Sequence, residues 1–263
     1  MKEQSVEPKI QAISPDGRVA ISLGGFLQAR YRGASIEKEA DVSQFGNPRT
    51  RLYSFGYIHS KDFRYRLMMG TPPHSQQVQL FDAYVEVRMA DELRLRAGRF
   101  KMPVFREWVE SARLQSSTER SALTMLLSPG RDYGLMASGS FLHENIEYAL
   151  GVFNGAGEVA AVDSNATPAF AGRMVWNTTG RSIEGEVDFH HSPLAVAIGA
   201  SGSSAWQPST PAVTPAQDLP HLREHRTGVE VTLRWDGMWP WNSWQGAASC
   251  PGSPRTPGVV LCV

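Results

Sequence analysis

The sequence has little cysteine. Its two cysteines, Cys250 and Cys262, both lie close to the C-terminal end of the 263-residue chain. Zinc takes four protein ligands in structural sites, and no histidine lies near either cysteine. We therefore interpret both cysteines as incidental, rather than as a disulfide or half of a metal site.

Long hydrophobic runs are also missing. No stretch approaches the roughly 18 consecutive apolar residues that a membrane-spanning helix needs, so helical spans are excluded. The first residues, MKEQSVEPKIQAISPDG, contain no apolar central region and do not form a signal peptide. We expect a chain that is mature, cytosolic or missing its true beginning. The 41% of hydrophobic residues excludes a disordered chain.

Neither sign of charge is in excess, since 26 Lys and Arg residues face 26 Asp and Glu residues. This balance argues against nucleic acid as a partner, because nucleic-acid binding relies on a basic excess.

Sequence signals for catalysis are weak. Glu107 and Glu110 lie three residues apart, which is typical of a solvated helix face, and the adjacent His190 and His191 would point to opposite faces of a strand. We predict no enzymatic activity, no metal and no cofactor.

A strong alternation of apolar and polar residues with a period of two runs through most of the chain. Residues 62–71, for example, alternate aromatic or aliphatic side chains with arginines. This period indicates β-strands. The predicted strands are 19–32, 49–59, 62–71, 77–89, 92–101, 131–142, 145–154, 169–177, 194–203 and 226–236. Their lengths match the ~9 to 11 residues with which a tilted strand crosses a bilayer.

The connections between these strands have two lengths. Short turns near residues 59–62, 90–92 and 143–145 alternate with loops at 33–48, 102–130, 155–168 and 204–225. Outer-membrane barrels have this asymmetry, with short periplasmic turns and long external loops. Residues 182–190 also alternate, but an extra strand there would place loop 204–225 on the wrong side. We interpret them as an extended turn or a strand extension.

The arginines on the polar face decide which face would meet lipid. An arginine on the lipid face near the bilayer midplane costs ~2 to 4 kcal/mol. We therefore expect the apolar face to contact acyl chains and the polar face to line an aqueous interior. A soluble β-barrel with an apolar interior, which would bind a ligand in its mouth, gives the same alternation and remains the alternative.

The segment from residue 93 to 141 resembles the phosphate-selective porin O/P family. In that family, a strand ending in Gly-Arg/Gln-Phe-Lys-x-Pro is followed by a long loop and an Arg-Asp-x-Gly strand start. The corresponding residues here are Gly98, Arg99, Phe100, Lys101 and Pro103, then Glu119, Arg120 and Ser121, then Arg131, Asp132 and Gly134. FDAYVEV (81–87), YALGVFNGAG (148–157), AGRMVW (171–176) and GVEVTLRW (228–235) extend the resemblance from about residue 18 to about residue 236.

The resemblance implies an antiparallel transmembrane β-barrel in the bacterial outer membrane, with 16 strands per chain in a homotrimer. About ten strands are predicted here. We expect a lead-in at residues 1–17, a porin-like region at 18–236 and a Pro- and Trp-rich tail at 237–263 outside the barrel. Pro240, Pro251, Pro254 and Pro257 argue against a paired strand in the tail. The composition change after Gly237 suggests a truncated or frame-shifted product.

In this interpretation, residues 102–130 form the third external loop, which narrows the pore, with a short helix in REWVESARL anchored by Trp108. The chain would be a diffusion channel for small anions, phosphate among them. An inactive porin fragment is a further alternative.

Most basic residues are arginine, since only five of the 26 are lysine. The planar guanidinium of arginine can donate hydrogen bonds to two phosphate oxygens at once. The predicted pore-lining residues are Arg64, Arg66, Arg94, Arg96, Lys101, Arg106, Arg113 and Arg120, any one of which can instead brace the wall through a salt bridge.

Overall fold

The computed structural model describes residues 10–34, 42–72, 77–115, 117, 119–155, 167–180, 183, 185, 193–207, 222–235, 241–249 and 259–262. The chain divides into two compact units, Met1–Val87 and Arg88–Val263. Within the described residues of both units, nearly all regular structure is antiparallel β-sheet, which confirms the predicted all-β antiparallel class.

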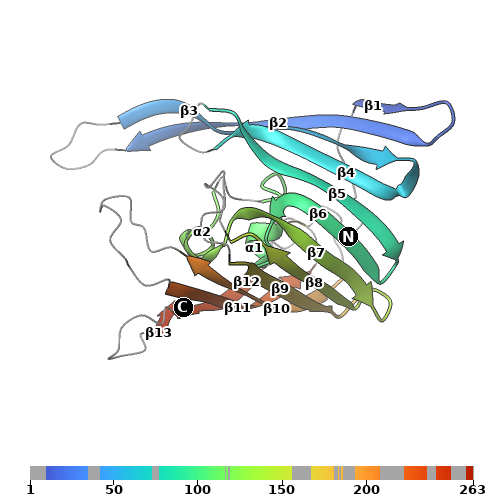
Figure 1. The fold of residues 1–263 in the computed structure, drawn as a ribbon. Coiled ribbons are helices and arrows are strands. Elements are labelled where there is room, and N and C mark those ends of the chain that lie inside the picture. The colour runs from blue at the N-terminus through green and yellow to red at the C-terminus, as the bar shows by residue number, and fades with distance from the viewer. Residues whose placement is uncertain are drawn as a thin grey trace. The chain divides into compact units, whose positions relative to one another are not determined.

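The first unit is a meander in which each strand pairs with the next along the chain (Figure 1). Its strands are β1 Ile10–Ile13, β2 Val19–Ala34, β3 Val42–Ile58, β4 Ser60–Thr71 and β5 Gln79–Ala90, the last of which ends just past the unit boundary. β2 and β3 have 16 and 17 residues and are the longest strands described. Such lengths exceed the average soluble strand of roughly 5 to 6 residues.

The second unit continues the same sequential antiparallel pairing. Its elements are β6 Leu93–Lys101, α1 Arg106–Val109, α2 Ala122–Leu127, β7 Arg131–Phe141, β8 Ile146–Phe153, β9 Ala169–Asn177, β10 Ala195–Gln207, β11 Leu222–Arg234, β12 Trp241–Ser249 and β13 Val259–Cys262. Both helices belong to the connection between β6 and β7. Neither of them, nor any other helix in the described part of the chain, has the length and apolar character to cross a bilayer.

All ten predicted strands are present, and most of their ends differ from the predicted ones by at most four residues. The exception is β3, which begins at Val42 instead of residue 49, so residues 42–48 of the predicted loop 33–48 belong to this strand. The expectation that residues 237–263 contain no paired strand is wrong, because β12 pairs with β11 along its whole length and β13 pairs with β12. The reason is the spacing of the prolines. Pro240 and Pro251 flank a proline-free segment long enough for a nine-residue strand, so neither ring removes a hydrogen bond from that strand.

The lead-in also contains a strand, since β1 forms a hairpin with β2. The connecting turn has the Asp-Gly pair that favours tight reversal, with Gly17 at a φ of 68°. Ser14 Oγ donates to Asp16 Oδ1 at 2.6 Å, and the backbone N–H of Arg18 donates to the same oxygen at 3.1 Å. The hydrogen bond from Ser14 is the main reason that the pKa of Asp16 lies below its usual value.

The two faces of the strands differ in exposure in the way that a lipid-facing apolar side requires. Large apolar side chains are exposed on one face, among them Leu135, Leu150 and Met174. The opposite face buries charged residues, including Arg51 and Asp132. A soluble barrel would bury the apolar set and expose the arginines, so this arrangement contradicts the soluble alternative.

One residue departs from the predicted face. Alternation places Phe81 on the apolar face, yet its side chain is buried and packs with Tyr53 and Met68 from the opposite side. The pairing of β4 with β5 has a register shift between Met68 and Met69, where Met68 faces Asp82 and Met69 faces Leu80. Phe81 is the extra residue of this bulge, which turns its side chain away from the period-of-two pattern.

A close approach of backbone to side chain fixes the hairpin of β7 and β8. Gly139 on β7 faces Tyr148 on β8, whose hydroxyl donates to the carbonyl oxygen of Glu92 at 2.8 Å. A Cβ at residue 139 would collide with that same carbonyl oxygen and lie 3.1 Å from Tyr148 Cε1. The aromatic ring therefore covers a site that only glycine can occupy.

We expect Gly139→Ala to destabilise the protein by roughly 1 to 3 kcal/mol, because the new methyl group overpacks against backbone that cannot move aside. Urea unfolding of detergent-solubilised protein, followed by loss of β-sheet circular dichroism, measures the effect. Gly46→Ala is the matched control, since a Cβ there meets no atom within 4 Å. Equal midpoints for the two variants would refute the close approach.

Candidate functional site

The loop between β6 and β7 carries three of the eight predicted site residues, Arg106, Arg113 and Arg120, and a fourth, Lys101, ends the strand before it. The strand β6 ends at Lys101, two residues before Pro103, as predicted. The predicted short helix is α1, and Trp108 is its only buried residue, at 4% exposure. The indole Nε1 donates to the carbonyl of Gly130 at 3.3 Å, which joins the start of the loop to its end. The prediction that Trp108 anchors this helix is confirmed.

The second helix, α2, was not predicted, although Ser121 before an apolar run is a helix-start signal. Ser121 Oγ accepts from the backbone N–H of Thr124 at 3.2 Å and caps the helix. The carboxylate of Glu107 accepts from Ser121 Oγ and from Thr124 Oγ1, both at 2.6 Å. Glu107 thus joins α1 to the start of α2, and its hydrogen bonds assign it a structural role.

Three cationic side chains surround the ring of Trp108. Arg120 Cζ lies 5.0 Å, Lys101 Nζ 5.7 Å and Arg131 Cζ 5.8 Å from the ring. Lys101 and Arg131 also occupy directly paired positions at the ends of β6 and β7. Like charges in such positions repel, and the electron-rich face of an indole offsets part of that cost.

Backbone carbonyls hold two of these cations in place. Lys101 Nζ donates to the carbonyls of Val109 at 3.2 Å and Glu110 at 2.8 Å. Arg120 donates to the carbonyls of Glu107 and Glu110, each at 3.0 Å. Carbonyls are neutral, so these particular contacts orient the cations without cancelling their charge. We call Lys101, Arg120 and Arg131 around Trp108 the cation cluster.

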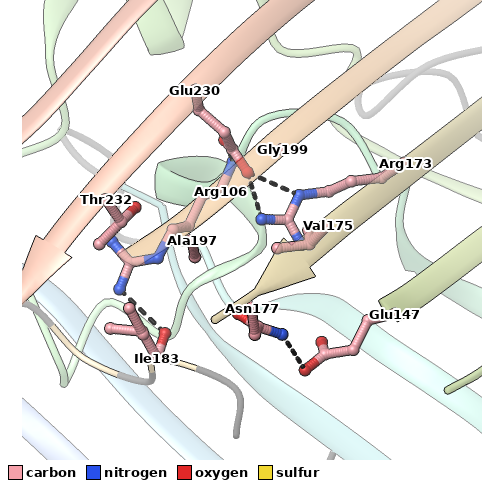
Figure 2. A pocket seen from close by; sticks show the side chains of 10 residues that line it. All are labelled: Arg106, Glu147, Arg173, Val175, Asn177, Ile183, Ala197, Gly199, Glu230 and Thr232. Carbon is pink, nitrogen blue, oxygen red and sulfur yellow. Dashed lines mark hydrogen bonds and ion pairs between the residues drawn. The ribbon is translucent and has the colours of Figure 1, made fainter. Parts of the chain in front are cut away.

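Arg106 lies in a second group of polar residues, which lines a small pocket on the polar face of β8–β11 (Figure 2). Its guanidinium donates to the carbonyls of Ile183 at 3.1 Å and Gly185 at 2.8 Å, and its backbone N–H donates to Glu230 Oε2 at 2.6 Å. Arg173 Nε donates to Glu230 Oε1 at 3.0 Å. The positive and negative side chains of this pocket largely offset each other.

The other predicted residues are dispersed. Arg64 and Arg66 lie on β4 in the first unit, where Arg64 donates to the carbonyl of Lys61 at 3.0 Å and Arg66 lies 3.7 Å from Asp82. Arg94 and Arg96 are partly buried on β6, with Arg96 5.4 Å from the ring centre of Phe100. Arg113 is exposed on the loop. Residues 182–190 lie mostly outside the described residues; of them, Ile183 and Gly185 are described and contact the loop.

Alternation alone did not single out several charged residues of the polar face. Arg173 and Glu230 each lie on a predicted strand, but only the loop and the sheet pairing show that they meet. Arg49 and Arg51 share their face with Tyr53 and Phe55. Because this face of the strand mixes arginine with aromatic residues, the alternation does not identify it as the polar face. Arg131 belonged to the quoted sequence motif and joins the cation cluster only in the folded loop.

The sequence motif after the loop has a structural explanation. Asp132 is almost fully buried, and its carboxylate accepts from the backbone N–H of Tyr133 at 2.8 Å and of Gly155 at 2.6 Å. Phe100 packs edge-on against Phe153 with 5.4 Å between ring centres. These contacts join the ends of β6, β7 and β8 beneath the loop.

The described residues contain no group of three or more His, Cys, Asp or Glu side chains that could hold a metal ion. The cation cluster contributes positive charge and an aromatic face to the site. Such groups attract an anion through Coulomb forces and charge-assisted hydrogen bonds.

The comparisons with known proteins agree with this architecture. No curated protein matches the chain. The family model described as phosphate-selective porin O and P matches residues 29–193, which include β3 to β9 and the whole loop with its cation cluster. This range is narrower than the resemblance expected from the sequence, but it covers more than half of the chain. The chain therefore belongs to the phosphate-selective porin O and P family, a family of outer-membrane channels.

Proposed function

We propose that the chain forms a passive diffusion channel for small anions in the bacterial outer membrane, with phosphate-like oxyanions as the permeant class. The single observation that supports this most strongly is the division between the two faces of the strands. Exposed leucine, methionine and aromatic side chains suit acyl chains, whereas buried arginine, aspartate and glutamate suit an aqueous path. Family membership supports the same function.

Anion preference in this proposal comes from the loop. Lys101 and Arg120 are held by neutral carbonyls, and Arg131 lies over the same indole. Arg66 lies beside Asp82, and Arg173 is paired with Glu230. Because three cations meet around one indole in the loop, we assign the main attraction for anions to the cation cluster, and a bracing role to Arg66 and Arg106. Arg64, Arg94, Arg96 and Arg113 add to the positive field along the path.

The test is a planar-bilayer measurement of the reversal potential of the full chain across a potassium chloride gradient, followed by phosphate addition. We expect a preference for chloride over potassium and a phosphate-dependent fall in chloride current. Lys101→Gln and Arg120→Gln should each lower the anion preference several-fold, because each removes one fixed charge from a region of low dielectric constant.

Arg18→Gln is the matched control for these charge changes. Arg18 lies in the turn between β1 and β2 and is two-thirds exposed, so solvent screens its charge. The control should keep the parent reversal potential. A cation-selective parent protein, or one that inserts and folds but passes no current, would refute the proposed function.

A further inference from the structure

Two consecutive loop residues, Phe105 and Arg106, contact two successive residue pairs on the polar face of β10 and β11. The backbone N–H of Phe105 donates to Ser201 Oγ at 3.1 Å, and Ser201 faces Gly228 across the strands. The backbone N–H of Arg106 donates to Glu230, which faces Gly199. The two contacted pairs are two residues apart on each strand and therefore lie on the same face of the sheet.

The sheet is shaped to receive these contacts. A Cβ at residue 228 would collide with the Phe105 ring and lie 2.9 Å from its Cδ1 atom. A Cβ at residue 199 would lie 2.8 Å from Glu230 Cγ. Glycine at both positions therefore lets the aromatic ring and the carboxylate lie flat against the strands. A side chain at residue 228 would push the Phe105 ring away from the strands, and one at residue 199 would displace the Glu230 side chain that contacts the loop.

The charge of Glu230 is shared between the loop and the sheet. One carboxylate oxygen accepts from the Arg106 backbone, and the other pairs with Arg173 on β9 (Figure 2). Glu230 and Arg173 are both largely buried, with side-chain exposures of 13% and 16%. A charge-assisted hydrogen bond is roughly twice as strong as a neutral one, and burial reduces its screening by water.

The backbone of Phe105 is a further sign that the loop is held in place. Its φ is 57°, a conformation that a residue with a bulky side chain rarely adopts without tertiary contacts to hold it.

We propose that Gly228 and Glu230 act as a latch that holds the β6–β7 loop at a fixed position over the polar face. Both are positioning residues: they set where the cation cluster stands and how much of the aqueous path the loop occupies. This inference rests on the proposed channel function for its effect on conductance. The latch itself is a statement about loop position and can be tested without any ion flux.

The first test measures trypsin cleavage after Arg113, an exposed residue within the loop. Full-length folded protein in detergent is digested, and the fragments are identified by mass spectrometry. We expect Gly228→Val and Glu230→Ala each to raise the cleavage rate roughly tenfold. Glu230→Ala loses a hydrogen bond to a charged group, which favours local opening by about that factor, and the side chain added in Gly228→Val collides with the Phe105 ring. Glu230→Gln keeps an acceptor oxygen for Arg106 and should recover part of the protection.

Two matched controls separate the latch from general destabilisation. Glu147→Ala removes a carboxylate from the same pocket, where Glu147 accepts from Asn177 Nδ2 at 3.1 Å. Gly46→Val adds the same side chain as Gly228→Val at a site where a Cβ meets nothing within 4 Å. Both should keep the parent cleavage rate. Gly228→Val changes sterics and Glu230→Ala changes hydrogen bonding, so either variant suffices if the other does not fold.

The second test is single-channel conductance with the same variants. Releasing the loop should raise the conductance and weaken the anion preference in Gly228→Val, which changes no charge. Parent-like cleavage rates in folded Gly228→Val and Glu230→Ala would overturn the latch. If the channel function itself is wrong, no protein conducts, yet the difference in cleavage between latch and control variants persists.

Discussion

Trp108→Ala is expected to destabilise the protein by roughly 3 to 5 kcal/mol, the usual cost of truncating a buried tryptophan. The side chain is 4% exposed and its indole donates to Gly130. Removing it leaves a cavity, takes away the partner of that carbonyl, and removes the aromatic face that Lys101, Arg120 and Arg131 share. These losses place the expected cost toward the upper end of that range.

Urea unfolding in detergent measures this effect, with two comparison variants. Trp108→Phe keeps an aromatic face for the cations but loses the N–H donor, and should recover most of the stability. Trp176→Ala makes the same truncation on the apolar face, where Trp176 is 47% exposed, and should cost far less. If Trp108→Ala is no more destabilising than Trp176→Ala, the indole does not organise the loop.

Leu150→Arg is expected to cost roughly 2 to 4 kcal/mol for folding into lipid vesicles, the range for an arginine on the lipid face near the midplane. Leu150 lies within β8, 61% exposed among apolar neighbours of the same face. The change adds one charge without disturbing a packed core. In a soluble protein, an exposed leucine replaced by arginine would change stability by little.

Ser140→Arg is the matched control, because it adds the same side chain on the polar face of the neighbouring strand β7, directly opposite Glu147. The folded fraction in vesicles, measured by heat-modifiable gel mobility, should fall for Leu150→Arg and stay near the parent value for Ser140→Arg. Equal folding of the two variants would argue that the apolar face does not meet lipid.

The native arginines on the polar face need not all contact the permeant ion. Arg173 is paired with Glu230, and Arg106 is hydrogen-bonded to two carbonyls. Such residues stabilise the position of the loop, which in turn places the cation cluster. A reduction in selectivity after mutation of Arg106 or Arg173 would therefore report on loop position as well as on lost charge.

The sequence alone determined the strands, their faces and the loop with its helix around Trp108. These features depend on local patterns: the period of two, the strand stop near Pro103 and one large aromatic residue in a polar helix. Local patterns gave a wrong prediction at Phe81, where a bulge shifts the strand register. They also gave a wrong prediction between Pro240 and Pro251, where the high proline content of the tail hid a proline-free segment long enough for a strand. They also missed β1, whose four residues are too few for a clear period.

Only the tertiary structure decided which charges meet. Arg106 and Glu230 are 124 residues apart, and Lys101 and Arg131 come together through strand pairing. Such contacts depend on sheet register and on the path of the loop, which no local period encodes. The cation cluster and the latch follow from that register, because it brings the loop residues against glycines and carboxylates of distant strands.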